Sequence, residues 1–195
     1  ALVSEGERDA AEALLERELQ RQPVWSEGHS TLSRIRLTAG DAANYDRSFA
    51  DACARQDGSF SLHLAWFHQA ALIKDWDKVR SILAKAELRY PGQSALRSAR
   101  FYLAAESGDE AGAEAAYGDV ANLADPGLDL CKVRYHLRKG HWGAAEECAR
   151  RHIGTPVGAM FWPYLSLIWR VTDNALAHWL DGAPPYLSVI DLDVS

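Results

Sequence analysis

The chain has 195 residues, with 21 Lys and Arg against 27 Asp and Glu, and a net charge of -6. This acidic balance, without a basic block, argues against a nucleic-acid partner. The sequence is rich in alanine and poor in β-branched residues, which favours close-packed helices over strands, so the expected class is all-α.

A turn marker recurs at a constant interval along the chain, which is typical of a repeat architecture. It falls at equal steps on Gly6, Gly40, Lys74 and Gly108, and then slightly early on Gly140. A helix that stops and reverses needs a residue at positive φ just past its end, and glycine adopts that conformation without Cβ strain. Each marker is therefore predicted to end one helix and open the next, so residues 1–6 match the last turn of a first helix.

A second marker keeps the same step and is predicted to close the second helix of each pair. It consists of Pro23, Asp57, Pro91, Asp125 and, slightly early, Pro156. Proline cannot continue a helix, and Asp before Gly or Pro makes a similar stop through turn chemistry. Small or apolar residues at helical spacing lie between the two markers, for example Tyr45, Phe49 and Ala52, or Val79, Leu83 and Ala86.

These interlocked markers resemble the tetratricopeptide repeat, and the segment from Lys74 to Val79 looks much like its inter-helix turn. The resemblance covers residues 1–156 and departs from the family pattern in the first helix of each unit. It implies a right-handed α-α superhelix of about five helix pairs. Residues 157–183 are then expected to form C-terminal capping helices, with Pro163 in a first turn.

The end of the chain changes character. Residues 184–195 alternate and are β-branched after Pro184 and Pro185, which predicts an extended linker or the first strand of a missing domain. The segment from Phe161 to Arg170, with the strand-like end, resembles the junction of iron(II)/2-oxoglutarate-dependent oxygenases in which a tetratricopeptide array precedes the catalytic barrel. The resemblance implies that the parent protein is an oxygenase and that this piece is its helical domain.

Catalytic, metal and cofactor sites are not expected within this chain. The seven histidines show neither H-E-x-x-H nor H-x-D/E spacing, and phosphate-loop and nucleophile-elbow motifs are missing. His29 and His63 are separated by the same step as the turn marker and are expected to pack in equivalent structural positions. Three cysteines without C-x-x-C spacing favour a reducing, cytoplasmic location, and the longest uncharged run contains prolines that argue against a membrane span.

A peptide-binding groove is the leading functional hypothesis. In this repeat class the groove is lined by the first helices, and the ninth position of each gives Arg34, His68, Tyr102 and Arg134. Two cations and an aromatic suit an acidic or carboxylate-bearing protein or peptide segment. Two alternatives remain: these residues are ordinary solvated or inter-helix contacts, or the array is a structural domain that packs on its own catalytic domain or forms a homodimer through the C-terminal tail.

Overall fold

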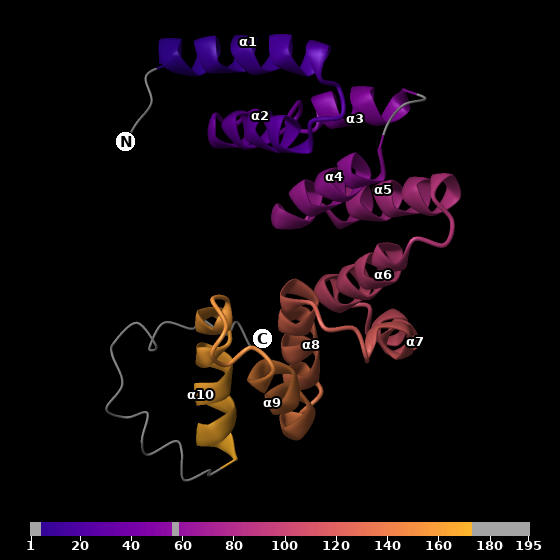
Figure 1. Cartoon of the computed structure of the whole chain (residues 1–195), viewed down its shortest axis with the longest axis vertical. Helices are drawn as coiled ribbons and strands as arrows, with labels where there is room; N and C mark the ends of the chain where they lie inside the picture. Colours follow the sequence, from indigo (N-terminus) through magenta and orange to yellow (C-terminus); the bar gives the residue numbers. More distant parts are fainter. Residues whose placement is uncertain (1–4, 56–58, 173–195) are drawn as a thin grey trace. The chain divides into compact units, whose positions relative to one another are not determined.

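The computed structural model describes residues 5–55 and 59–172 (Figure 1). This part of the chain forms helices, and no strand occurs in it. The helices are α1 (Glu5–Arg21), α2 (Ser26–Thr38), α3 (Arg47–Ala54), α4 (Phe60–Leu72), α5 (Trp76–Arg89), α6 (Ser94–Ser107), α7 (Glu110–Val120), α8 (Pro126–Arg138), α9 (Trp142–Arg150), the 3-10 helix η1 (Gly158–Met160) and α10 (Trp162–Val171). Two compact units, residues 1–103 and 104–195, divide the chain within α6.

Four helix reversals follow the predicted turn marker. Gly40, Lys74, Gly108 and Gly140 have φ values of 82°, 57°, 81° and 71°. At each one, the N–H of the next residue donates to the carbonyl four residues before the turn residue, as in Asp75 N to Ala70 O at 3.1 Å and His141 N to His136 O at 2.8 Å. This bond pairs a carbonyl that the helix end leaves unsatisfied. The prediction of turns at these four positions is confirmed.

Two details of the predicted register are wrong. Gly6 lies inside the first turn of α1, which begins at Glu5, so it does not separate two helices. The second helix after Gly40 begins only at Arg47, and Tyr45 is buried in the preceding turns. Part of the reason is local: the Asp41 carboxylate accepts from the Asn44 backbone N–H at 3.3 Å and from its Nδ2 at 3.0 Å, which stabilises a turn.

The second marker ends helices in some repeats and begins one in another. Pro23 and Pro91 follow α1 and α5, as predicted. Asp125 instead caps α8, because its Oδ1 accepts from the Leu128 N–H at 2.9 Å. Pro156 lies between α9 and η1. Asp57 is outside the described residues.

Unit 1 packs its core between successive first and second helices. Figure 1 shows α2 lying between α1 and α4. The main cluster joins α3, α4, α5 and the start of α6 through Phe49, Leu62, Trp66, Phe67, Val79, Ile82, Leu83 and Leu96. Ser59 caps α4 and Asp75 caps α5, each accepting a backbone N–H at 3.2 Å. The sequence therefore places a cap at the start and an αL residue at the end of α4.

Unit 2 has an apolar core next to a buried polar network. In Figure 1, α9 lies between α8 and α10. The apolar cluster contains Val133, Ala145, Cys148, Ala149, Phe161, Leu165, Ile168 and Trp169. Beside it, Lys132 Nζ donates to Asp129 Oδ1 at 3.0 Å and to the carbonyls of Ala121 and Leu123 at 3.3 and 2.6 Å. His152 Nε2 lies 3.0 Å from the other Asp129 oxygen. We call Asp129, Lys132 and His152 the buried polar network.

The C-terminal part is described as far as residue 172. Pro163 lies in the first turn of α10, as predicted, and Leu165, Ile168 and Trp169 are buried. The further capping helix expected up to residue 183, and the linker or strand at 184–195, lie outside the described residues. Within residues 5–55 and 59–172, no helix is both long and apolar enough to cross a membrane.

The turn residues can be tested by exchange. Lys74 is a side-chain-bearing residue at a positive φ, whereas Gly108 has a similar φ and open space around its Cβ position. Lys74→Gly is expected to raise the free energy of unfolding by about 1 kcal/mol, and Gly108→Lys to lower it by about as much. Urea unfolding followed by circular dichroism measures both. Loss of stability in Lys74→Gly would contradict the strain assigned to that turn.

The buried polar network makes a second prediction. Lys132 and Asp129 have 0% exposed side chains, so removing Lys132 leaves the buried carboxylate with only the more distant Arg151, whose Nη1 lies 3.7 Å away, as a cation. Lys132→Met should lower the free energy of unfolding by about 3 kcal/mol. The double variant Lys132→Met with Asp129→Asn should recover part of that loss, because the uncompensated charge is gone. Equal stabilities of the single and double variants, measured by urea unfolding, would speak against charge pairing.

Candidate functional site

The predicted site residues of unit 1 occupy the same register on three first helices. Arg34 lies on α2, His68 on α4 and Tyr102 on α6, each at the same distance before a turn residue. The helices are neighbours: α2 contacts α4, and the rings of Phe67 and Tyr102 lie edge to face with centroids 6.0 Å apart. We call Arg34, His68 and Tyr102 the first-helix stripe.

The stripe lies on the less buried side of these helices. Arg34 is exposed, although Ser33 and Arg36 beside it are buried. His68 is exposed between buried Phe67 and Gln69, and Tyr102 is half-buried between buried Phe101 and Leu103. Consecutive residues of a helix are about 100° apart, so one side of each helix packs inward while the stripe faces away.

The chemistry of the stripe differs from one residue to the next. The Arg34 guanidinium makes no ion pair within the part of the chain that the structure describes. The His68 ring packs edge to face on Phe67, with centroids 5.6 Å apart. Tyr102 packs against the same phenylalanine. Phe67 therefore supports both aromatic members of the stripe, and Arg34 supplies its charge.

Arg134 belongs to unit 2 and has a different environment. It lies on α8, half-buried, with Nε and Nη2 3.0 and 2.9 Å from one Glu106 carboxylate oxygen. Cys131 Sγ lies 3.6 Å from the same oxygen. The charge of Arg134 is thus paired within the chain, unlike that of Arg34. Three of the four predicted residues lie in the same register on first helices of unit 1, and that all four form one groove stays a prediction.

The two equivalent histidines are buried rings held by nearby carbonyls. His29 Nε2 lies 3.0 Å from Pro23 O, and His63 Nδ1 lies 3.1 Å from Ser59 O. Burial lowers the pKa of both imidazoles, and it also lowers the pKa of His136 on α8. Residues 5–55 and 59–172 contain no group of three or more His, Cys, Asp or Glu placed to hold a metal ion.

A cleft in unit 1 was not predicted from the sequence. It has a volume of about 580 Å³ and lies between α1 and α3, with one side of α2 as its floor. Arg36 closes one end, since its Nε lies 3.4 Å from Glu12 and its Nη1 donates to Asn44 O at 3.2 Å. The other end is lined by Leu19, Pro23, His29 and Arg55. We call this space the α1–α3 cleft.

Known structures resemble this fold, although no protein-family model and no curated protein matches the sequence. A tetratricopeptide repeat protein from Parabacteroides merdae is similar with a TM-score of 0.60 and 12% identity, over 90% of this chain and 71% of that one. A thermophilic TPR protein from Thermus thermophilus gives 0.60 and 20%, over 82% and 91%. PilF of Pseudomonas aeruginosa gives 0.59 and 14%, over 90% and 83%. The prediction of all-α, tetratricopeptide-like helix pairs is confirmed.

The buried histidines predict how stability depends on pH. Because their folded pKa values are lowered from 6.5, the neutral rings contribute stability that is fully present above about pH 6.5. That contribution is lost as pH falls further, through the folded pKa values. The free energy of unfolding should therefore drop between pH 7 and pH 5, and His63→Gln should reduce the size of the drop. Urea unfolding at both pH values measures it, and a His63→Gln drop equal to that of the parent chain would refute the assignment.

Proposed function

We propose that this chain is a non-catalytic interaction module that binds an acidic protein or peptide segment along the first-helix stripe. The observation that carries this proposal is the shared register of exposed Arg34 and His68 and half-buried Tyr102 on α2, α4 and α6. A repeated, outward-facing position on stacked helices is the form of surface on which helix-pair arrays hold extended segments.

Arg34 is the principal anchor in this proposal. Its guanidinium can take a carboxylate in a bidentate pair without first breaking an ion pair within the described residues. Tyr102 and His68 offer ring surfaces and hydrogen-bonding groups beside it. Arg134 would have to share Glu106 with the incoming carboxylate, so it contributes less to affinity than Arg34.

The wider setting of the module is also a proposal. The oxygenase-like junction supports a parent protein in which this array docks or recognises a partner for a catalytic domain. Catalytic residues, metal and cofactor are assigned to no position of this chain, because the sequence lacks H-x-D/E spacing. The three free cysteines are buried, which supports a reducing compartment such as the cytoplasm. A homodimer through residues 184–195 belongs to the alternative in which the array is a structural domain.

The stripe can be tested with one charge reversal and a matched control. A fluorescein-labelled peptide of alternating Asp and Leu with a free C-terminal carboxylate serves as the probe. Arg34→Glu should weaken its binding by about tenfold or more, measured by fluorescence anisotropy at low salt. Arg17→Glu reverses the charge of another exposed arginine of unit 1, on α1, and should leave the affinity within about twofold.

The same measurements separate the module from its alternative. If Arg34→Glu and Arg17→Glu weakened peptide binding equally, the peptide would be recognising the net charge of the chain and not the first-helix stripe. Absence of peptide binding together with a stable dimer in analytical ultracentrifugation would favour the structural role. Binding that depends on Arg34 in a monomeric chain would support the interaction module.

A further inference from the structure

Helix α1 differs from the other second helices on one of its sides. By its place in the repeat, α1 is a second helix, as α5 is two repeats later. Ile82 and Ala86 of α5 are 1% and 3% exposed in the cluster that α4 and α5 share. The equivalent residues of α1 are Leu14, which is 49% exposed, and Glu18, whose side chain is 30% exposed. Within the described residues, the side of α1 that a first helix would cover is therefore open.

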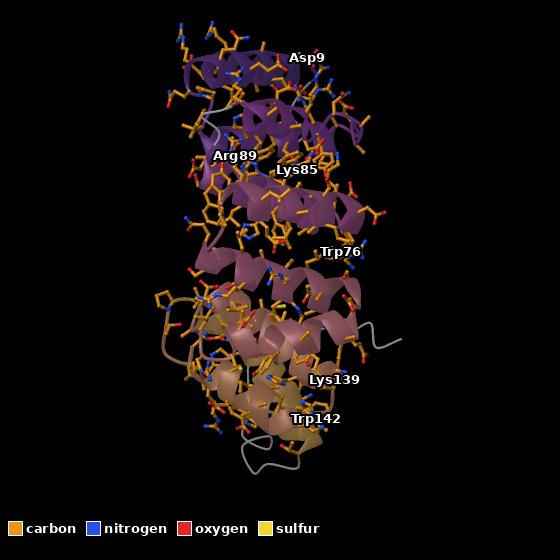
Figure 2. The ribbon with its side chains drawn as sticks, turned by 90° about the vertical axis from the view of Figure 1, so that its right-hand side faces the viewer. Asp9, Trp76, Lys85, Arg89, Lys139 and Trp142 are labelled. Carbon is orange, nitrogen blue, oxygen red and sulfur yellow. The ribbon has the colours of Figure 1, made fainter. Side chains whose placement is uncertain are left out.

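The open side of α1 carries three residues in one line. Glu7, Leu14 and Arg21 are seven residues apart, and at about 100° of rotation per residue the outer two lie within about 20° of Leu14. All three residues are exposed. In Figure 2, α1 lies at the end of unit 1, and side chains project from it away from the neighbouring helices. We call Glu7, Leu14 and Arg21 the α1 outer line.

The opposite side of α1 is attached to unit 1. Leu19 is 7% exposed, and the Arg36 side chain of α2 pairs with Glu12 at 3.4 Å and with Glu16. These three α1 residues lie about 140–160° around the helix from Leu14. The α1 outer line is thus turned away from the rest of unit 1, where another molecule can contact it.

The charges of the α1 outer line are complementary to those of a second copy. Glu7 lies in the first turn of α1 and Arg21 is its last residue, at equal distances from Leu14. If two α1 helices run antiparallel with Leu14 at the centre, Glu7 of each copy lies opposite Arg21 of the other. A parallel pair would set Glu7 against Glu7 and Arg21 against Arg21. Arg21 also lies 2.9 Å from Glu18 of its own helix, but a guanidinium has five donors and can bind a second carboxylate.

Small residues lie beside the α1 outer line at the levels where a second helix would bring long ones. In the antiparallel arrangement, exposed Ala10 and half-buried Ala11 lie opposite Glu18 and Arg17 of the second copy. Alanines let two helix axes approach to about 8–10 Å, and the aliphatic stems of the longer side chains can cover them. The outer surface of α1 therefore fits a copy of itself in shape as well as in charge.

We propose that two copies of this chain associate through α1, which pairs antiparallel with α1 of the second copy around a two-fold axis at Leu14. Leu14 packs on Leu14, and Glu7 of each copy pairs with Arg21 of the other. A first helix also runs antiparallel to its second helix, so α1 of the second copy lies where a first helix lies in the other pairs. A single pair of 17-residue helices buries less area than a standard interface, and we expect a dissociation constant of about 0.1 mM.

This association is separate from the first-helix stripe. The stripe lies on α2, α4 and α6, and none of its residues belongs to α1. At the low micromolar concentrations of a peptide titration, a dimer of this affinity is dissociated. Peptide binding and dimerisation can therefore be measured separately, and either can fail without the other.

The first experiment measures the mass of the whole chain by sedimentation equilibrium between about 10 μM and about 1 mM. Leu14→Lys sets two like charges against each other at the two-fold axis and should weaken the dimer by about tenfold or more. Because Leu14 is already exposed in the single chain, the melting temperature should stay within about 2 °C of the parent value. Arg34→Glu is the control on α2 and should leave the dimer unchanged.

The second experiment tests the antiparallel register by mixing two variants. Glu7→Lys and Arg21→Glu should each weaken the dimer by about tenfold, because each gives two like-charged pairs between identical copies. In an equimolar mixture both pairs become attractive, so the two variants should associate about as tightly as the parent chain. Positions 7 and 21 are about 21 Å apart along α1, so this restoration cannot arise within one chain. Circular dichroism checks that each variant keeps its helix content.

Three results would overturn the proposal. A chain that stays monomeric at about 1 mM does not dimerise through α1. A dimer that persists unchanged in Leu14→Lys uses another surface of the chain. A mixture of the Glu7→Lys and Arg21→Glu variants that associates no more tightly than either variant alone would refute the antiparallel pairing.

Discussion

The constraint on which this structure depends is the left-handed residue at the end of each first helix. A chain that reverses direction must satisfy the last carbonyls of the helix it leaves, and a residue at positive φ brings the next N–H back to them. Gly40, Lys74, Gly108 and Gly140 all do this with the same hydrogen bond. Because the reversal uses one hydrogen bond, α3, α5 and α9 return against α2, α4 and α8, and equivalent positions of the first helices keep one register.

Long polar side chains join the second helices where apolar contacts do not. Arg36 of α2 bonds to Glu12 of α1 and to the turn before α3. Arg89 of α5 donates to a carbonyl at the end of α3, and Lys132 of α8 donates to a carbonyl after the end of α7. Arg89 and Lys132 meet carbonyl oxygens at the C-terminal ends of α3 and α7, where the helix dipole favours positive charge.

The sequence predicts the features that local geometry decides. A turn that requires a positive φ selects glycine, so glycine recurs at a fixed interval in the sequence. Lys74 was located only because it falls at that interval, since lysine has no preference for positive φ. The late start of α3 could not be predicted, because the Asp46 carboxylate before it is engaged by Trp66 Nε1 at 2.9 Å and Lys78 Nζ at 3.0 Å, which come from the later helices α4 and α5. The pairing of Arg134 with Glu106 is equally non-local, since it joins α8 to α6. The α1–α3 cleft is lined by side chains of three helices and the turn between two of them, a combination that single-helix patterns do not show.

Helix pairs of similar shape can pack in each other's place, which would produce a wrongly assembled array. In unit 2 the buried polar network disfavours such an exchange. Asp129 and Lys132 are fully buried and pair with each other. Lys132 also donates to the carbonyls after α7, and Asp129 lies 3.0 Å from His152 Nε2 and 3.7 Å from Arg151 Nη1. A helix pair from another repeat set against α8 would bring Ala52, Ala86 or Val120 to the position that His152 occupies. An unpaired charge buried at low dielectric constant would raise the free energy of structures in which repeats are exchanged or shifted. The network thus favours the correct order of repeats over swapped arrangements that apolar packing alone would tolerate.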